Sequence, residues 1–339
     1  MIEAITIEGL RGIRTGTLEG LGELTILTGP NGCGKSTVLD ALLIATHPRP
    51  DIGVALAVGR RKAAWNASQW LVANFASAAE LRCRTDGDER ITHLTAEAEV
   101  SYVAHKLLRE EHLLEPYGSL YVDVTTSMGQ ANGSVAFAGD SRYVIPEPDA
   151  FGMLKGHARS TRLADPGRPK PIHEEFSAAV RQGHKGIIID TLRQLVNIDD
   201  LDILTEEGTP VLYVVPKVGK AVPVSMSGDG IQAVVQMAVE LSSVAVGAVL
   251  IEEPEVYQHP RALLQTARAM WATVQRGVQV VITTHSLELI DAIIDAAEAN
   301  AMQKAVLFNL ALDDGALKVS RYSGEQVKLA RSDIESDLR

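Results

Sequence analysis

The sequence predicts an α/β fold, with a mainly parallel sheet, flanking helices, an antiparallel β lobe and a helical insertion. A glycine-rich segment, 29–36, lies between a strand-like segment, 23–28, and a helix-like segment, 37–44. Between residues 245 and 297, apolar strand-like runs alternate with helical runs, which is typical of a parallel sheet covered on both faces. Between 90 and 147 the pattern changes to short strands separated by turns, which indicates the antiparallel lobe.

The glycine-rich segment reads Gly-Pro-Asn-Gly-Cys-Gly-Lys-Ser and fits the phosphate-binding pattern G-x-x-x-x-G-K-[ST]. Its glycines allow backbone N–H groups to surround a di- or triphosphate, and the following helix N-terminus adds unsatisfied donors. Lys35 supplies a point charge toward the β- and γ-phosphates, and the Ser36 hydroxyl is placed to ligate Mg²⁺. The alternative is a chance glycine-rich turn, which the flanking strand and helix disfavour. The predicted nucleotide contacts are Asn31, Gly32, Cys33, Gly34, Lys35, Ser36 and Thr37.

The overall composition is that of an ordinary globular protein with an ample core. Of the 339 residues, 46% are hydrophobic and 22% are charged, and the length suits one large domain or two modest ones. The net charge of −11 argues against a broad basic surface for nucleic acid, although a local patch can still bind it. The two cysteines lack metal-site spacing, and we find neither a signal peptide nor a membrane-spanning run, so we expect a cytoplasmic protein.

Apolar periodicity and turn residues predict the elements between these landmarks. We expect helices at 56–82, 173–196, 231–241, 262–275 and 287–297. We expect strands at 91–103, 119–126, 134–138, 142–145, 201–204, 211–215, 245–251, 278–283, 305–312 and 316–322, with turns at 86–88 and 132–133 and a long basic loop at 146–172. The whole chain, 1–339, is expected to form a single head. Its nucleotide-binding core is 1–50 and 220–339, and 51–219 supplies the β lobe and the helical insertion.

Carboxylates follow the apolar strand predicted at 245–251. Because a buried strand is apolar throughout, acids at its C-terminal end face the edge of the sheet where ligands bind. Glu252 can hold Mg²⁺ or its water shell, and Glu253 is placed to orient or deprotonate the attacking water. The alternative is a solvated acidic turn after a strand, which is less probable beside a phosphate loop.

Two further segments are candidates for the same site. His285 follows the strand predicted at 278–283, where it could hydrogen-bond a γ-phosphate, although a structural histidine is the more common occurrence. Ser286 could be the N-cap of the next helix. Segment 227–230, Ser-Gly-Asp-Gly, precedes a helix and could cradle phosphate, although a tight turn with an N-cap is the simpler interpretation when that segment is taken alone.

Taken in order, these pieces resemble the ABC-type ATPase heads of the RecF, SMC and OLD-like group. The resemblance covers both ends of the chain and says little about 50–220. It implies a P-loop NTPase fold of the ABC-ATPase kind, with ATP and Mg²⁺ as cofactors. The matching segments are 5–12 (the opening strand with its Arg11), 29–37 (Walker A), 227–230 (the signature motif), 251–260 (the E-E-P-E…H-P Walker B of OLD-like ATPases) and 283–286 (the switch histidine).

In this group two heads sandwich two ATP molecules. The resemblance therefore implies a homodimer in which Ser227 and Gly228 act in trans on the partner's γ-phosphate. The chain departs from the pattern at Glu252, where many relatives have Asp, and at Asp229, where transporter signatures have Gly. The glutamine of the lobe-connecting loop cannot be placed, and Gln69 and Gln130 are only guesses.

We expect the chain to form a complete head without an effector of its own. No long heptad region separates the motifs, and only about fifty residues follow His285, whereas a Toprim nuclease domain needs on the order of 100. We therefore expect a Mg²⁺-dependent ATPase whose dimer is a switch controlling a separate effector, such as a nuclease, or a DNA transaction in phage defence or repair. The alternatives are the ATPase subunit of an ABC transporter, or an ATP-binding scaffold with little turnover.

Direct DNA contact is a weaker hypothesis. Segment 60–62, Arg-Arg-Lys, and the basic loop residues between 155 and 170 could neutralise phosphates. Short charge runs of this kind are more often solvated surface.

Overall fold

The computed structural model describes residues 1–59, 71–72, 78–97, 118–138, 141–145, 160–164, 172–242, 244–256, 258–298, 300–332 and 337–338. The chain divides into two compact units. Unit 1 comprises Met1–Leu21, Gly29–Thr161 and Leu310–Ser320, and unit 2 comprises Gly22–Thr28, Arg162–Asn309 and Arg321–Arg339. That residues 1–339 work as a single head stays a prediction.

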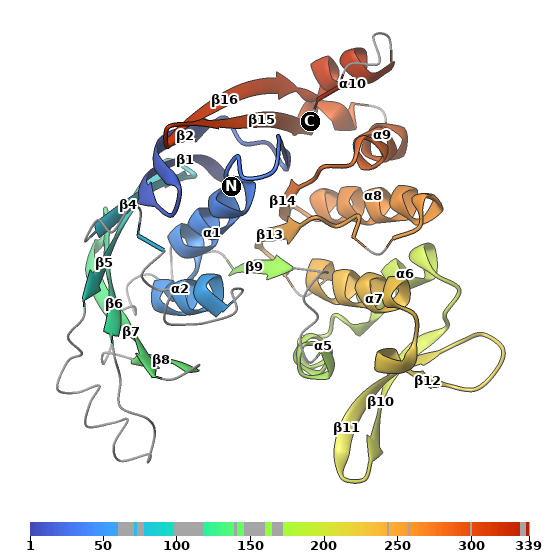
Figure 1. The fold of residues 1–339 in the computed structure, drawn as a ribbon. Coiled ribbons are helices and arrows are strands. Elements are labelled where there is room, and N and C mark those ends of the chain that lie inside the picture. The colour runs from blue at the N-terminus through green and yellow to red at the C-terminus, as the bar shows by residue number, and fades with distance from the viewer. Residues whose placement is uncertain are drawn as a thin grey trace. The chain divides into compact units, whose positions relative to one another are not determined.

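Unit 1 is built on an antiparallel sheet with two helices against it. The strands follow the order β8-β7-β6-β5-β4-β1-β2-β16, and helices α1 and α2 pack on β1, β4, β7 and β8 (Figure 1). The pairs from β8 to β2 are antiparallel, as predicted for the lobe. The elements are β1 (Ile2–Leu10), β2 (Ile13–Glu19), α1 (Lys35–Thr46), α2 (Pro50–Gly59), β4 (Ala78–Thr85), β5 (Asp88–Glu97), β6 (Gly118–Thr126), β7 (Gly129–Ala138), β8 (Ser141–Ile145) and most of β16 (Ala316–Ser323).

Unit 2 contains the parallel sheet that the sequence predicts. β14 pairs in parallel with β13 on one side and β3 on the other, and β3 pairs in parallel with β15. A separate three-stranded sheet follows the order β10-β11-β12. The elements are β3 (Leu24–Thr28), β9 (Ser160–Ala164), α5 (Ile172–Arg181), α6 (Lys185–Leu195), β10 (Asp200–Glu206), β11 (Thr209–Val215), β12 (Val222–Pro223), η3 (Val224–Met226), α7 (Asp229–Ser242), β13 (Gly247–Glu252), α8 (Pro260–Gln275), β14 (Gln279–Thr283), α9 (Leu287–Ala296), η4 (Ala301–Lys304), β15 (Ala305–Asp313) and α10 (Gly324–Ser332).

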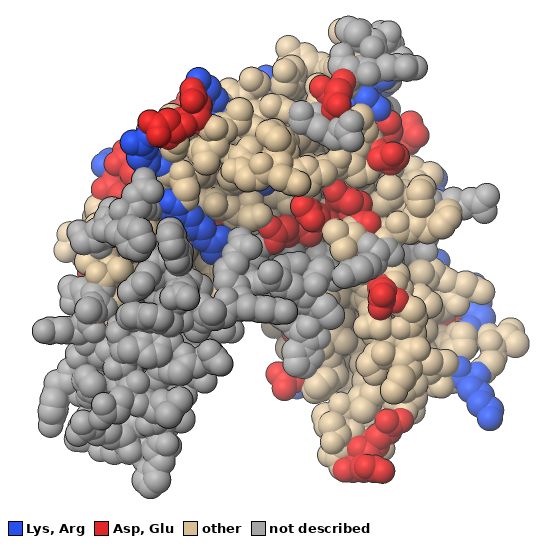
Figure 2. Space-filling model, viewed as in Figure 1, with Lys and Arg blue, Asp and Glu red and all other residues tan. Residues whose placement is uncertain are grey.

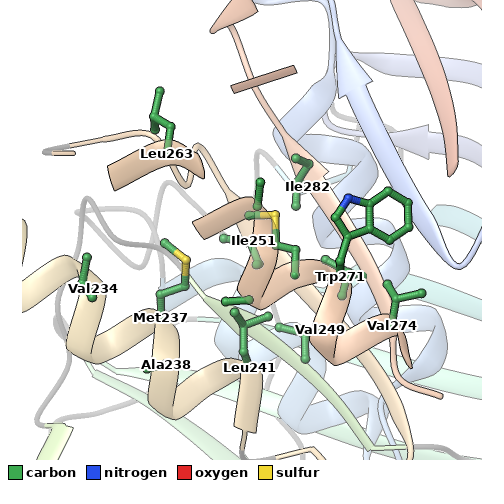
Figure 3. Close-up of a cluster of buried hydrophobic side chains, with 14 of the residues drawn as sticks. Val234, Met237, Ala238, Leu241, Val249, Ile251, Leu263, Trp271, Val274 and Ile282 are labelled. Carbon is green, nitrogen blue, oxygen red and sulfur yellow. The ribbon is translucent and has the colours of Figure 1, made fainter. Parts of the chain in front are cut away.

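The parallel strands of unit 2 form because their sequences are apolar on both faces. All residues of β3 and β14 are buried, and β13 is buried up to its last residue, Glu252. Helix α8 packs against β14 and β3, and it also contacts α6, α7 and α9 (Figure 1). Figure 3 shows this core, in which Met237 and Leu241 of α7 point toward Val249 and Ile251 of β13. Because these strands are buried in the core, their ends hold the acidic residues that follow β13 in a defined position.

Several predicted boundaries are wrong, and cross-strand pairing explains two of them. The helix predicted at 56–82 ends its described part at Gly59, and β4 begins at Ala78 because alternate residues are buried between β1 and β5. The turn predicted at 132–133 lies inside β7, where Asn132 pairs with Asp123 of β6. The predicted turn at 86–88 is confirmed, since Asp86 and Gly87 have φ values of 47° and 83°, as a two-residue hairpin turn requires.

The helical insertion is also divided differently from the prediction. The helix expected at 173–196 is two helices, α5 and α6, because Gly183 takes a φ of 82° and ends the first. Helix α10, in the charged C-terminal segment, was not predicted. The long loop predicted at 146–172 is wrong at Ser160–Ala164, which form strand β9. The remaining predicted strands and helices of unit 2 are present with boundaries that shift by a few residues.

Candidate functional site: a phosphate loop and an acidic sheet edge

The phosphate loop of unit 1 depends on glycine at its start and its end. Gly29 has a φ of 132°, and a Cβ there would lie 2.2 Å from the carbonyl oxygen of Leu310. Gly34 has a φ of 101° and is the N-cap of α1. These left-handed conformations are open to glycine and strained for other residues. The glycines at the first and sixth positions of the phosphate-binding motif are therefore required by the backbone conformation of the loop.

The N-terminus of α1 offers its N–H groups free of competing side chains. Among the described residues, no side chain caps this terminus and no acidic residue lies in the first turn. Such a terminus suits an anionic ligand, because its donors and dipole both favour negative charge. Asn31 and Gly32 are exposed at the tip of the loop, and Ser36 in the first turn is half-buried. Thr37 and Cys33 are buried, so they support the loop from beneath.

Lys35 lies across the loop and is buried. Its Nζ donates to the carbonyl oxygen of Gly29 at 2.8 Å and to that of Pro30 at 3.1 Å. The Nζ also lies 3.8 Å from the Cys33 Sγ. The ammonium group is therefore held at the phosphate loop itself, where the predicted nucleotide contacts are.

A buried ion pair anchors α1 beneath the loop. Asp40 is fully buried on α1, and its carboxylate pairs with Arg11 from the turn between β1 and β2. The Arg11 Nη2 also donates to the Ala57 carbonyl oxygen of α2 at 3.3 Å. Arg11, which is part of the family resemblance of segment 5–12, therefore pairs with Asp40, and the sequence alone did not show this pairing.

The C-terminal end of α1 is held by Arg90 of β5. The Arg90 Nη1 donates to the His47 carbonyl oxygen at 3.0 Å, which suits a cation near a helix C-terminus. Burial lowers the pKa of Arg90 to about 10 and raises the pKa of the Cys83 thiol to about 12. Burial also lowers the pKa of His47, the first residue after α1. Three titratable groups therefore share one poorly solvated region at this helix end.

A second group of candidate residues lies at the edge of the parallel sheet in unit 2. Glu252, the last residue of β13, pairs with Thr283 of β14, and Thr283 pairs with Leu27 of β3. The Thr284 N–H donates to the Leu27 carbonyl oxygen at 3.0 Å. The carboxyl ends of β3, β14 and β13 therefore lie side by side, and this is the edge at which open α/β sheets bind ligands. Strand β3 ends at Thr28, and the phosphate loop is the next segment of the chain.

Glu253 and His285 lie together at this edge. The Glu253 Oε1 is 3.4 Å from the His285 Nε2, and the two side chains are 41% and 34% exposed. Glu253 has a φ of 45°, and its N–H donates to the Thr283 carbonyl oxygen at 3.1 Å and to the Thr283 Oγ1 at 3.2 Å. A non-glycine residue in this region is strained and often marks a functional position. The structure thus brings together two of the residues that the sequence singled out.

Glu255 has a contact that the sequence analysis missed. Its Oε1 accepts hydrogen bonds from the Thr284 Oγ1 at 2.7 Å and from the His285 N–H at 3.0 Å. The only available signal was a third carboxylate in the run Glu-Glu-Pro-Glu. The turn that carries Glu255 is held in place by Gln258, whose Nε2 donates to the Pro254 carbonyl oxygen at 2.6 Å and whose Oε1 accepts from Thr266 of α8 at 2.6 Å.

Ser286 is a helix cap, as one interpretation of the sequence proposed. Its Oγ accepts the Leu289 N–H at 3.0 Å at the start of α9. The Ser286 N–H donates to the Thr284 Oγ1 at 2.9 Å. Ser286 therefore fixes the helix that follows His285 and has a structural role at this edge.

The segment at 227–230 lies at the start of α7 in unit 2. The Ser227 Oγ donates to the Val224 carbonyl oxygen at 2.5 Å, and Gln232 donates to the Ser227 carbonyl oxygen at 2.8 Å. Gly228 is exposed, and no described atom lies within 4 Å of where its Cβ would be. Its carbonyl oxygen accepts the Ile231 N–H at 2.8 Å. The tight turn of the simpler interpretation is present, and Gly228 at its tip is exposed.

Other predicted residues have no described role at these sites. Gln130 is an exposed residue of β7, and Gln69, segment 60–62 and most of the basic loop lie outside the described residues. On the face shown in Figure 2, the described Lys and Arg side chains occur in small separate groups. Within the described ranges, no three His, Cys, Asp or Glu side chains converge as a metal site. No helix in the described parts of the chain is long and apolar enough to span a membrane.

Two family models match the chain. The model described as "AAA domain, putative AbiEii toxin, Type IV TA system" matches residues 117–291, which is more than half of the chain. A model described as "AAA domain" matches residues 4–55, the segment that contains the phosphate loop. Together they span both the phosphate loop and the acidic edge.

Three curated proteins are similar over parts of the chain. Uncharacterized protein MJECL11 of Methanocaldococcus jannaschii is 32% identical over 33% of this chain and 98% of its own length. Uncharacterized protein MJECL10 of the same organism is 35% identical over 19% of this chain and 30% of its own. The DNA double-strand break repair Rad50 ATPase of Methanopyrus kandleri is 45% identical over 14% of this chain, but only 6% of the Rad50 chain is covered.

Solved structures show the fold. The Smc head bound to the C-winged helix domain of ScpA superposes with a TM-score of 0.54 at 12% identity, covering 96% of this chain and 98% of that one. The Smc head with an extended coiled coil, bound to the C-terminal domain of ScpA derived from Pyrococcus furiosus, gives 0.53 at 12% identity, covering 99% and 100%. The chain therefore has the fold of an SMC-type head and belongs to the family of AAA-domain ATPases whose model matches residues 117–291.

Proposed function

We propose that the chain is a Mg²⁺-dependent ATPase in which the phosphate loop binds the nucleotide and Glu253 activates water. The observation that carries this proposal is the pair formed by the Glu253 Oε1 and the His285 Nε2, 3.4 Å apart at the carboxyl edge of a parallel sheet. Backbone donors from 31–37 and the Lys35 ammonium bind the β- and γ-phosphates. Lys35 is already at the loop, 2.8 Å from the Gly29 carbonyl oxygen.

Ser36 and Glu252 are the proposed protein ligands of a magnesium ion that is also held by nucleotide phosphates, as the resemblance of their motifs implies. Mg²⁺ in such sites takes one or two protein oxygen ligands together with phosphate oxygens and water, so a dedicated cluster of protein carboxylates is not needed. The Ser36 hydroxyl stands in the first turn of α1, and Glu252 is half-buried at the end of β13. The ion would supply neutralisation of charge on the phosphates.

Glu253 acts on the water that attacks the γ-phosphorus. Its carboxylate accepts the water proton as the new phosphorus–oxygen bond forms and the bond to the ADP oxygen breaks, which gives ADP and inorganic phosphate. The strained φ of 45° is consistent with a side chain held for this task. His285 contacts Glu253 and is available to donate a hydrogen bond to a phosphate oxygen.

The proposed working unit is a homodimer in which Ser227 and Gly228 contact the nucleotide of the second copy. Support comes from their position at the N-terminus of α7 and from the open space around Gly228. The motif resemblance set out in the sequence analysis implies the same arrangement. Each head would then complete the site of its partner.

We further propose that the ATP-bound dimer is a switch for a separate cytoplasmic partner, either an effector such as a nuclease or a DNA transaction. The matched family is described by the name of an AbiEii toxin of a Type IV toxin–antitoxin system, which supports a role in defence. A 45% identical match to a stretch of a DNA double-strand break repair Rad50 ATPase supports repair instead. The Smc heads to which the fold is similar were solved with ScpA, so a head of this shape can carry a partner protein.

Steady-state hydrolysis tests the ATPase assignment. Wild-type protein should release phosphate from ATP with Mg²⁺ and stop when EDTA is added. Lys35→Ala should lose hydrolysis, whereas Lys318→Ala, which removes a lysine 66% exposed on β16, should keep it. Equal rates in wild type and Lys35→Ala would refute the assignment of the loop.

Light scattering tests the dimer. With Glu253→Gln to slow turnover, ATP should convert the monomer to a dimer. Gly228→Asp should prevent this conversion by placing a carboxylate against the partner's nucleotide. Gly186→Asp is the matched control, because Gly186 also has no described atom within 4 Å of a Cβ. If both variants dimerise equally, Gly228 is not in the interface.

Affinity purification of tagged Glu253→Gln protein from its native host, with ATP and Mg²⁺, tests the partner. A nuclease or other effector that co-purifies with ATP and not with ADP would support the switch. An integral membrane protein in its place would support the transporter alternative. Recovery of the dimer alone would contradict the switch and favour an ATPase without a client.

A further inference from the structure

Glu255 makes a contact that the proposed reaction does not use. It stands two residues after Glu253, on the turn that follows β13. Its Oε1 accepts two hydrogen bonds from one short segment, from the Thr284 Oγ1 at 2.7 Å and from the His285 N–H at 3.0 Å. A carboxylate only accepts hydrogen bonds, and its charge strengthens both of them. One oxygen therefore ties the turn after β13 to the segment after β14.

The segment that Glu255 contacts, Thr284 and His285, is also held by hydrogen bonds to β3 and to Ser286. The Thr284 N–H donates to the Leu27 carbonyl oxygen at 3.0 Å, and the Thr284 Oγ1 accepts the Ser286 N–H at 2.9 Å. Thr284 is fully buried. The Thr284 hydroxyl thus donates to Glu255 and accepts from Ser286, so it has a defined orientation. The main chain on both sides of the His285 Cα is held by these bonds.

The contact is a costly way to stabilise a turn. The second oxygen of Glu255, Oε2, is buried without a hydrogen-bond partner among the described residues. A buried polar oxygen left unpaired destabilises the folded state, and more so when it is charged. What the contact does achieve is a fixed position for His285, whose Nε2 lies 3.4 Å from the Glu253 Oε1. The segment from Glu253 to Glu255 therefore carries both the proposed base and the group that places the neighbour of that base.

We propose that Glu255 is a positioning residue for ATP hydrolysis, and that its Oε1 sets the place of His285 relative to Glu253 by holding the Thr284 hydroxyl and the His285 N–H. This inference rests on the proposed roles of Glu253 and His285. Glu255 acts through His285 and does not itself transfer a proton. Its loss should slow the chemical step and leave ATP binding intact.

The test combines Glu255→Gln with His285→Ala and measures kcat and KM for ATP in all four proteins. Glu255→Gln keeps the size of the side chain and removes its charge. It should lower kcat on the order of 10- to 100-fold, because small misplacements of a reacting group cost that much. KM and the equilibrium Kd for ATP should stay within about twofold. In the His285→Ala background the same change should cost less than about twofold, because a residue that acts through His285 has nothing left to position.

Two further variants keep the test independent of folding. Thr284→Val removes the hydroxyl partner of Glu255 from the other side and should reproduce the fall in kcat, while Thr284→Ser should restore it. Glu288→Gln is the matched control, since Glu288 is an exposed carboxylate near the same segment that accepts from Ser286 and should leave kcat unchanged. If Glu255→Gln lowers the midpoint of thermal unfolding strongly, the comparison of Thr284→Val with Thr284→Ser carries the test.

The outcomes separate this inference from the function on which it rests. An equal loss from Glu255→Gln in both backgrounds, or a rise in KM with unchanged kcat, would overturn the positioning role. The same holds if Glu255→Gln is silent while Glu253→Gln and His285→Ala are impaired. If Glu253→Gln and His285→Ala both hydrolyse ATP like the wild type, the assignment of the reaction itself is wrong.

Discussion

The phosphate loop and the acidic sheet edge are built in different ways. The loop owes its shape to main-chain conformation, with left-handed glycines at 29, 32 and 34 and a lysine that donates to carbonyl oxygens of the same loop. The acidic edge owes its shape to side chains that bond across about thirty residues, such as Glu255 to Thr284. A site shaped by local backbone conformation can be recognised from a short sequence motif. A site shaped by side-chain contacts depends on which strands pair, and a short motif does not show this.

We expect the largest loss of stability from a substitution in the Arg11–Asp40 ion pair, which anchors the helix that follows the phosphate loop. Asp40→Ala removes the fully buried carboxylate that pairs with Arg11, whose side chain is 15% exposed, and this should destabilise the protein by about 3–5 kcal/mol. Urea unfolding measures this loss directly. Arg84→Ala is the control, because it breaks a half-exposed pair with Glu3 and should cost at most about 1 kcal/mol. Similar losses for both would mean that the Arg11–Asp40 pair does not support α1.

Backbone dependence predicts a large difference between two glycines of the loop. At Gly29 a Cβ would lie 2.2 Å from the Leu310 carbonyl oxygen, so Gly29→Ala should cost at least about 3 kcal/mol and abolish ATP binding. At Gly32 the φ of 79° adds strain, but no described atom lies within 4 Å of the Cβ. Gly32→Ala should therefore cost about 1 kcal/mol. Thermal unfolding with and without ATP ranks them, and the reverse order would contradict a loop fixed by its main chain.

The acidic edge should respond more mildly to loss of its helix cap. Ser286→Ala removes the acceptor for the Leu289 N–H and should cost about 1 kcal/mol. Ser286→Asp keeps an acceptor at the same helix N-terminus and should recover most of that stability. The measurement is the urea midpoint of each variant. No loss in Ser286→Ala would show that α9 does not need this cap.

Acid should weaken the end of α1 by a small amount. Burial lowers the pKa of His47 from 6.5, so the unfolded chain binds a proton at a higher pH than the folded chain does. The neutral His47 costs no folding stability above about pH 6.5. Stability falls as the pH drops from there through the lowered pKa of the folded state. His47→Asn should therefore lose less stability than wild type between pH 7.5 and pH 5.5 in urea unfolding. An equal loss in both would assign the acid sensitivity to other groups.

The secondary structure shows the same contrast between local pattern and long-range contacts. The loop at 29–36, β3, β13, β14 and the helices after them are predictable because each is set by local pattern and by burial on both faces. The start of β4 was placed in a predicted helix because the segment before it is Ala-rich, whereas β4 itself alternates buried and exposed residues and pairs with β1 and β5. The split between α5 and α6 depends on one glycine, Gly183, whose left-handed conformation the sequence permits without requiring.

The candidate site divides in the same manner. Lys35, Glu253 and His285 were found because their residue types follow strands in a familiar order. Glu255 was missed because its function, if the proposal holds, is to bond to a segment thirty residues away. The partner of Arg11 was missed for the same reason, since nothing in the sequence pairs it with Asp40. Long-range side-chain contacts are the part that only the folded chain displays.

The most direct test of the account is single-turnover hydrolysis of pre-bound ATP by wild type and Glu253→Gln, with the Kd for ATP measured in parallel. We predict that Glu253→Gln binds ATP within about threefold of wild type and cleaves it on the order of 10²- to 10⁴-fold more slowly, as removal of a general base requires. Equal cleavage rates in the two proteins would contradict the proposed role of Glu253 and would favour a scaffold that holds ATP.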